Sequence, residues 1–396
     1  MARRTWAQRF HPQKRIAEMN SYVSYFRPEI DSMTGYTPGE QPKGVPVIKL
    51  NTNENPYPPS PGVKKTLASF QYEKLRLYPD PLALEVRAEI AAMTGFSVNN
   101  IIAGNGSDDI LTIATRCFSD ARRPMACFEP SYSLYPTLAG LQGTPCIRIQ
   151  LTEDFEIPDD TLQQARNANL FIIARPNAPT GNLFPKAKME EICAKFNGIV
   201  LIDEAYADFS RDNCLDFVRK YPNVIISRTF SKSRSLAGLR FGFAVAHEKI
   251  IDGMMKMKDS YNVPMLTQKL ALASLWDRSY FDTCVAKVKT TREALTLALR
   301  DLGFKVINSD TNFVFAAPPI DAKNYFLDLK RRNILVRYFP AARTCSFVRI
   351  TIGTPEEMTE LLKVTRELIG KNLTAADRNT GRLKAETGRR THWTIL

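Results

Sequence analysis

Residues 224–243 read Val-Ile-Ile-Ser-Arg-Thr-Phe-Ser-Lys-Ser-Arg-Ser-Leu-Ala-Gly-Leu-Arg-Phe-Gly-Phe. The apolar run predicts a buried strand, and hydroxyl residues, Lys232, a small-residue turn and Arg240 follow it. A lysine among such anion-binding groups is typical of an amine that forms a Schiff base with a phosphate-bearing aldehyde, pyridoxal 5′-phosphate (PLP). The alternative is a solvated surface lysine, which the motifs upstream disfavour.

A carboxylate and a phenol follow a second apolar run. The segment Ile199-Val-Leu-Ile-Asp203-Glu-Ala-Tyr206 predicts a short buried strand that ends at Asp203. Ligands of open α/β sheets bind at the carboxyl ends of strands. PLP is an electron sink only while its ring nitrogen is protonated, so Asp203 is predicted to face that nitrogen and Tyr206 the ring 3′-oxygen. The same pattern fits a Walker B strand, but the chain has no Gly-x4-Gly-Lys-Ser/Thr loop.

Two further apolar runs end in turns that contain glycine or proline. Leu170–Ala174 leads into Arg-Pro-Asn-Ala-Pro-Thr-Gly, where Asn177 is a candidate donor to the ring oxygen. Ile101–Ala103 leads into residues 104–109, Gly-Asn-Gly-Ser-Asp-Asp, which predict the start of a helix with free amides for a phosphate. Each segment alone also fits an ordinary turn, and the glycines match only part of a dinucleotide-binding fingerprint.

In their order, these motifs resemble a fold-type-I PLP aminotransferase. They are Gly104-Asn-Gly-Ser-Asp108, Pro130-Ser-Tyr132, Pro176-Asn-Ala-Pro-Thr-Gly181, Asp203-Glu-Ala-Tyr206, Ser231-Lys232 and Arg240. Other segments are similar to the histidinol-phosphate aminotransferase family, over about residues 36–370. They are Gly35-Tyr-Thr-Pro-Gly39, Leu50-Asn-Thr-Asn-Glu-Asn-Pro-Tyr57, Tyr78-Pro-Asp80, Thr311-Asn-Phe-Val314, Ile334-Leu-Val-Arg337 and Val348-Arg-Ile-Thr-Ile-Gly-Thr354.

The resemblance implies roles for further residues of the cofactor site. Tyr132 is expected to stack its flat face on the pyridine ring. Tyr78 is expected to reach the phosphate in the neighbouring subunit, which implies a homodimer with shared active sites. The other phosphate ligands implied are three backbone amides and three side chains, those of Gly106, Ser107 and Asp108 and those of Thr229, Ser231 and Arg240.

The resemblance also implies a substrate site for an anion. Arg349, assisted by Arg337, is expected to bind the substrate anion, because guanidinium groups form paired hydrogen bonds with phosphates and carboxylates. Tyr36, from the partner subunit, is expected to contact the substrate phosphate, and Asn55 to lie on the substrate side.

Two positions depart from the family's pattern in the Pro-Thr-Gly segment. Much of the family has asparagine directly before this tripeptide, where it binds the ring oxygen, but this chain has Ala178. Asn177, one residue earlier, is the expected replacement. Arg175 also stands where asparagine is commoner.

Composition agrees with a two-domain enzyme. With 396 residues, of which 44% are hydrophobic, the chain is long enough for a large core, and no apolar run approaches a membrane span. Seven cysteines without a Cys-x-x-Cys pair predict reduced thiols in a cytoplasmic setting. The three histidines, His11, His247 and His392, are isolated, which disfavours a metal cluster or a histidine-based triad.

The net charge of +13 is concentrated at the two ends. Residues 1–16 carry five basic side chains and no acidic one, and residues 371–396 carry six basic and two acidic side chains. Basic tails can bind nucleic acid, but solvated termini are commoner, and we expect no nucleic-acid or membrane partner. An organelle transit peptide is the alternative at the N-terminal end, although early serines are lacking and Pro12 is present.

We predict an α/β fold of the fold-type-I PLP transferases, with a mostly parallel sheet flanked by helices in the large domain and a smaller α/β domain. Residues 61–289 are assigned to the large PLP-binding domain and 290–370 to the small C-terminal domain. Residues 1–60 are predicted to form an arm that partly joins the small domain, and 371–396 a flexible basic tail.

The reaction implied is transamination of L-histidinol phosphate, with 2-oxoglutarate as amino acceptor. Lys232, once freed, is expected to be the general base. Alternatives on the same scaffold are an aromatic amino acid aminotransferase and a phospho-amino-acid decarboxylase. Two alternatives are more distant. One is an ATPase, which the Walker B pattern would suggest. The other is a nucleic-acid-binding regulator with an aminotransferase-like sensor, but neither tail has the length or pattern of a helix-turn-helix domain.

Overall fold

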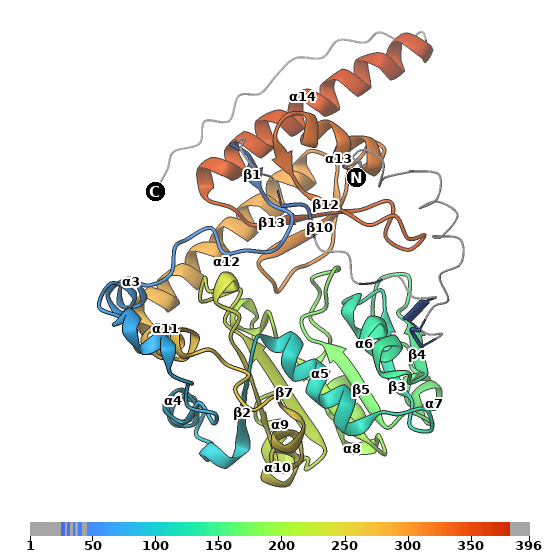
Figure 1. Cartoon of the computed structure of the whole chain (residues 1–396). Coiled ribbons are helices and arrows are strands. Elements are labelled where there is room, and N and C mark those ends of the chain that lie inside the picture. Colours follow the sequence, from blue (N-terminus) through green and yellow to red (C-terminus); the bar gives the residue numbers. More distant parts are fainter. Residues whose placement is uncertain (1–24, 28–29, 32–34, 36–38, 42–45, 381–396) are drawn as a thin grey trace, which may run out of the picture.

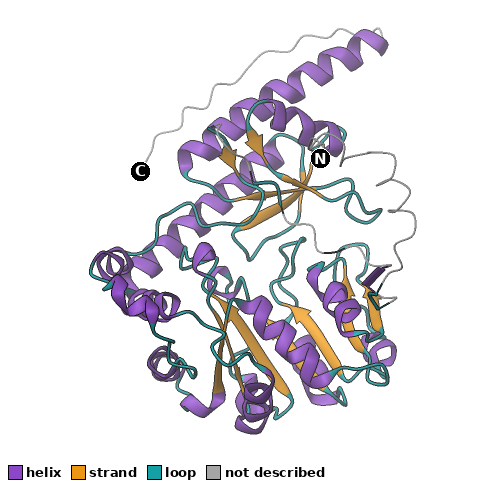
Figure 2. Ribbon diagram, in the orientation of Figure 1, coloured by secondary structure: helices purple, strands orange, loops and turns teal. Residues whose placement is uncertain are grey.

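The large sheet of the computed structural model has seven strands in the order β2-β8-β7-β6-β5-β3-β4 (Figures 1 and 2). The structure describes residues 25–27, 30–31, 35, 39–41 and 46–380, with side chains to residue 370. Strands β3 to β7 run parallel to one another, and β8 runs antiparallel to both of its neighbours, which confirms the predicted α/β class. The strands are β2 Ile101–Gly104, β3 Met125–Glu129, β4 Cys146–Gln150, β5 Leu170–Ala174, β6 Ile199–Asp203, β7 Val224–Thr229 and β8 Gly242–Ala246.

Helices cover both faces of this sheet. Successive residues of a strand point to opposite faces, and the buried side chains accordingly form two clusters, one on each face. One face packs against α5 Ser107–Phe118, α6 Leu134–Gln142 and α10 Glu248–Met257. The other packs against α4 Leu84–Thr94, α8 Lys186–Lys195, α9 Phe217–Lys220 and α11 Met265–Trp276.

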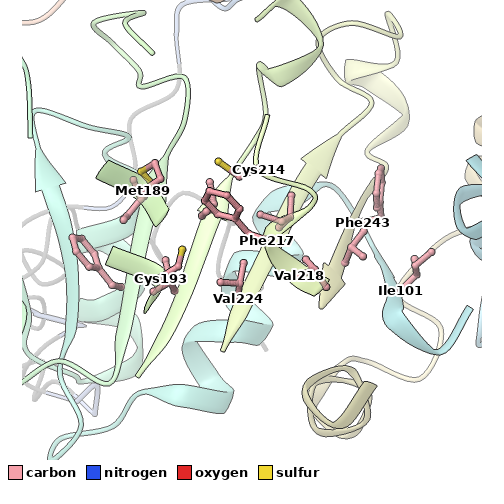
Figure 3. Packing of buried hydrophobic residues seen from close by; sticks show 14 of the residues in the cluster. Ile101, Met189, Cys193, Cys214, Phe217, Val218, Val224 and Phe243 are labelled. Carbon is pink, nitrogen blue, oxygen red and sulfur yellow. The ribbon is translucent and has the colours of Figure 1, made fainter. Parts of the chain in front are cut away.

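The second of these faces is shown in Figure 3. Met189 and Cys193 of α8, and Phe217 and Val218 of α9, lie over the sheet near Val224 of β7. The remaining short elements are α3 Pro61–Ala68, α7 Thr161–Ala165, η2 Tyr72–Arg76, η3 Val98–Asn100, η4 Ala207–Phe209 and η5 Ala237–Leu239.

A second, antiparallel sheet lies beyond the upper edge of the large one in Figure 1, in the order β12-β13-β10-β9. Its strands are β9 Lys305–Val306, β10 Phe313–Ala317, β12 Arg337–Tyr338 and β13 Val348–Thr351. Beside it, β1 Ile48–Lys49 from the N-terminal arm pairs in parallel with β11 Ile334–Leu335. The helices α12 Arg278–Asp301, α13 Ala322–Arg331 and α14 Pro355–Thr380 pack around a separate apolar core.

Helix α12 is continuous across residue 289, where the sequence places the boundary between the domains. Val285 and Val288 already belong to the core of the second sheet. The predicted boundary therefore falls inside a helix and not in a linker. In the described part of the chain, no helix is both long and apolar enough to cross a membrane.

Candidate active site

Ten of the predicted site residues line one cavity at the carboxyl ends of the large sheet's strands. One of them, Arg349, comes from β13 of the second sheet. The ten are Ser107, Asp108, Tyr132, Asp203, Tyr206, Thr229, Ser231, Lys232, Arg240 and Arg349. The segments that carry them are far apart in sequence, so the fold brings them together.

Lys232 follows β7 and its amine points into the cavity. Its Nζ donates to the backbone carbonyl of Thr52 at 3.2 Å. Burial, with the nearby charge of Arg349, lowers the pKa of Lys232 to about 8. The amide of Asn55 donates to the carbonyls of Lys232 and Ser233, at 3.0 and 3.1 Å, and does not line the cavity. Asn55 therefore holds the lysine's backbone, which differs from the substrate contact predicted for it.

Asp203 ends β6 and is only 4% exposed. Its carboxylate accepts hydrogen bonds from the hydroxyls of Tyr135, at 2.9 Å, and Ser227, at 3.1 Å. Burial raises the pKa of Asp203 to about 6, although both hydrogen bonds act in the opposite direction. Tyr135 and Ser227 are not among the predicted site residues, and no motif marks their roles. A buried carboxylate of this kind is suited to hold a cationic ring nitrogen.

The opposite end of the cavity is built to accept an anion. Arg240 lies there, donating to Asp108 at 3.0 Å and to Ser231 at 3.3 Å. Gly106, at the start of α5, has φ of 89°, and a Cβ there would lie 2.5 Å from the Arg240 guanidinium. A Cβ on Gly242 would lie 2.4 Å from the amide nitrogen of Ser107. Glycine at both positions lets the helix start, with its free amides, approach the arginine, which fits a phosphate group.

Asn177 does not take the position that the sequence suggested. It is fully buried, and its amide donates to the Pro130 carbonyl, at 3.1 Å, and to the Thr180 hydroxyl, at 2.7 Å. Ala178 lines the cavity instead. Because the methyl group of Ala178 offers no donor, a donor to a ring oxygen has to come from elsewhere. Tyr206 lines the cavity, and its hydroxyl accepts a hydrogen bond from Asn53 at 2.8 Å.

A larger cavity of about 680 Å³ continues outward from this site and shares Thr52, Tyr132, Ala178 and Arg349 with it. Arg337 lines it, and β12 pairs with β13 so that Arg337 lies directly opposite Arg349. The guanidinium of Arg349 donates to the Asn51 carbonyl at 3.1 Å. Two guanidinium groups at one cross-strand position make this a binding site for an anion.

Of the two tyrosines predicted to act across subunits, Tyr78 lines neither of these two cavities. Tyr78 is 79% exposed and stacks on Tyr261, with ring centroids 4.5 Å apart. Tyr36 lies outside the described residues. Within the described ranges, no three His, Cys, Asp or Glu side chains are grouped as a metal site requires.

Known proteins with similar sequences are aminotransferases. The family described as aminotransferase class I and II matches residues 45–364. A histidinol-phosphate aminotransferase of Microcystis aeruginosa is 47% identical over 338 residues, which are 85% of this chain and 96% of that protein. One from Geobacter sp. is 42% identical over 86% of this chain and 98% of its own length.

Among solved structures, the fold matches histidinol-phosphate aminotransferase from Sinorhizobium meliloti, determined in complex with pyridoxal-5′-phosphate. The TM-score is 0.79 at 24% identity, over 88% of this chain and all of that one. The chain therefore belongs to the class I and II aminotransferases, the class that its sheet and its lysine–carboxylate site also define. Within that class it groups with the histidinol-phosphate aminotransferases.

Proposed function

We propose that this chain transfers the amino group of L-histidinol phosphate to 2-oxoglutarate, with PLP as its cofactor. The observation that carries the proposal is the arrangement of charges around one connected space. A half-buried amine, that of Lys232, and a buried carboxylate, that of Asp203, lie in the inner cavity, and Arg349 and Arg337 line the outer one. The two halves correspond to a site for an amino-transfer cofactor and a site for an anionic substrate.

The residues of the inner cavity fit the cofactor at each end. The amides at the start of α5, with Thr229, Ser231 and Arg240, would hold its phosphate. Asp203 would keep a proton on its ring nitrogen, and Tyr132 would offer a flat face to the ring. When bound, PLP supplies an electron sink for the substrate carbon that loses a proton.

Lys232 carries that proton. A general base has to be neutral before it accepts a proton, and efficiency is highest when its pKa is near the working pH. Because burial lowers the pKa of Lys232 to about 8, about a tenth of the amine is neutral at pH 7, far more than for a lysine with its ordinary pKa of about 10.4. The depressed pKa of Lys232 is therefore matched to a proton transfer at the substrate carbon.

Arg349 and Arg337 give the site its preference for anions. Histidinol phosphate has a phosphate and no carboxylate, whereas 2-oxoglutarate has two carboxylates. A pair of guanidinium groups on neighbouring strands can hold either anion, since each presents oxygens in the spacing that the planar fork matches. One pair of arginines therefore serves both half-reactions.

We assign the chain to a cytoplasmic homodimer whose sites are shared, with Tyr78 and Tyr36 acting on the partner's cofactor phosphate and substrate. Exposed apolar side chains on neighbouring elements support this assignment. Leu75, Leu77 and Leu82 are each about half exposed or more, and they flank the largely exposed Tyr78. Exposed apolar side chains that are grouped in this way are expected at an interface between two copies of the chain.

A side-by-side assay of the purified protein tests the substrate assignment. Histidinol phosphate, phenylalanine, tyrosine and threonine phosphate are each supplied with 2-oxoglutarate, and keto product, glutamate and carbon dioxide are measured. We expect glutamate to form fastest with histidinol phosphate. Faster turnover of phenylalanine or tyrosine would reject the substrate, and carbon dioxide release would reject the reaction type.

A further inference from the structure

The N-terminal arm reaches the phenol of Tyr206 through one side chain. Asn53 is 2% exposed, and its Nδ2 donates to the Tyr206 hydroxyl oxygen at 2.8 Å. The other side of the same amide faces the second sheet, where the Thr351 hydroxyl donates to Oδ1 at 3.2 Å. Asn53 is thus the link between β13 and the phenol.

The backbone of Asn53 is held as firmly as its side chain. Its N–H donates to Thr351 Oγ1 at 3.0 Å, and its carbonyl accepts from the amide of Asn312 at 2.9 Å. Its φ is 57°, a left-handed conformation that asparagine tolerates better than most residues. The two side-chain hydrogen bonds place the amide oxygen toward Thr351 and the amide nitrogen toward Tyr206, and this is the orientation on which the proposal rests.

That orientation decides where the phenol's proton points. A tyrosine hydroxyl has one proton to donate and lone pairs that accept. Because its oxygen accepts from Asn53, its own proton is directed at another acceptor, and the cavity that Tyr206 lines lies beside it. Donation from Asn53 also polarises the O–H group, which makes the phenol a stronger donor.

The need for a strong donor follows from the neighbouring residues. Ala178 presents a methyl group to the cavity, and the Asn177 amide is bonded to Pro130 and Thr180. We therefore expect the Tyr206 hydroxyl to donate the hydrogen bond to the cofactor's ring oxygen.

We propose that Asn53 is a positioning residue that orients and strengthens Tyr206 as the hydrogen-bond donor to the cofactor's 3′-oxygen, compensating for alanine at position 178. The inference rests on the proposed function, because it assumes that PLP occupies the inner cavity. Asn53 lines the inner cavity beside Tyr206, and its hydrogen bond with Thr351 ties the strength of the Tyr206 donor to the position of β13, which also carries Arg349.

The test is a pH titration of the visible absorbance of the PLP-loaded protein, for the wild type and for Asn53→Asp and Asn53→Gly. A donor to the ring oxygen favours its anionic form, so a weaker donor lets that oxygen hold a proton to higher pH. In Asn53→Asp the new side chain accepts and draws the Tyr206 proton away from the cavity. In Asn53→Gly the left-handed backbone conformation is kept and the amide is lost.

We expect the midpoint to rise by about one pH unit in Asn53→Asp, the size of one charge-assisted hydrogen bond, and by less in Asn53→Gly. Both variants are repeated in a Tyr206→Phe background. There the shift of Asn53→Gly should vanish, and Asn53→Asp should keep only the through-space effect of its charge.

Three outcomes overturn the proposal. A midpoint that falls in Asn53→Gly means that the amide has the opposite orientation and accepts from Tyr206. An unchanged midpoint means that Asn53 does not influence the donor. Shifts of equal size with and without the Tyr206 hydroxyl mean that Asn53 acts by another route. Failure of the wild type to develop visible absorbance with PLP would instead refute the proposed function.

Discussion

Asp203→Asn removes one charge from the inner cavity and leaves the side chain's shape almost unchanged. Burial raises the pKa of Asp203 from its ordinary 3.8 to about 6, which corresponds to about 3 kcal/mol against the charged form at 1.36 kcal/mol per pH unit. By linkage, an interaction with a cationic ring nitrogen that returned the pKa of Asp203 to its ordinary value would favour the protonated ring by that same amount. Asparagine provides no such charge.

We therefore expect the half-reaction with histidinol phosphate to slow by about 10²-fold or more in Asp203→Asn, since about 3 kcal/mol corresponds to that factor. The rate is measured in single turnover by stopped-flow absorbance, which isolates chemistry from product release. Tyr135→Phe is the matched control, because it removes a 2.9 Å hydrogen bond to the same carboxylate and keeps the charge. Its expected loss is about 10-fold, the size of one hydrogen bond to a charged group.

A half-reaction rate in Asp203→Asn within a few-fold of the wild-type rate would refute the role of Asp203, since the carboxylate would then not face the ring. A Tyr135→Phe loss as large as that of Asp203→Asn would show that the hydrogen bond that holds the carboxylate, and not its charge alone, is what matters.

Lys232→Ala should abolish turnover, and borohydride treatment of the wild type should leave a cofactor-derived mass on the Lys232 peptide; wild-type turnover in the variant would contradict the assignment. Because the pKa of Lys232 is lowered to about 8, the rate of PLP uptake by cofactor-free protein should rise with pH and level off above about 8; a continued rise toward the ordinary lysine pKa of about 10.4 would show a solvated amine. Mixing Lys232→Ala subunits with a Tyr36→Ala, Tyr78→Ala double variant should restore activity, and no recovery after verified subunit exchange would mean that each site is built from one chain. The kcat/KM for histidinol phosphate should exceed that for histidinol by about 10²-fold or more, because loss of the phosphate leaves guanidinium charge without its anion. Arg337→Ala should reduce this ratio of kcat/KM values, and equal kcat/KM values for the two substrates in the wild type would reject phosphate recognition.

The fold and most of the cavity were predictable because strand ends carry their own signals. Asp203 ends one apolar run and Lys232 follows another, so each residue marks the carboxyl end of a strand. Parallel strands bring their carboxyl ends to one edge of the sheet. The roles predicted for Tyr132, Arg240 and Arg349 came from the family resemblance, and the structure places these three side chains around one cavity.

What the sequence did not reveal depends on contacts between distant segments. Asn53 and Tyr206 are separated by 153 positions, and Tyr135 and Asp203 by 68, so no local pattern records either hydrogen bond. Asn177 was assigned wrongly because its neighbour Ala178, not Asn177, points into the cavity. The domain boundary was placed inside α12 because an amphipathic helix shows no break where it passes from one core to the next.

The continuity of α12 restricts how the two sheets can move relative to each other. Its 24 residues make a rod about 36 Å long, at 1.5 Å per residue. Near its start, Asp277 accepts a hydrogen bond from Gly62 of α3 at 2.7 Å, whereas Val288 and Leu295 are packed in the core of the second sheet. A helix resists stretching, so the second sheet cannot slide away along this axis. Phe315 of β10 and Phe347 also pack in an apolar cluster of the large sheet, so α12 and this contact together hold Arg349 of β13 at the cavity that contains Lys232.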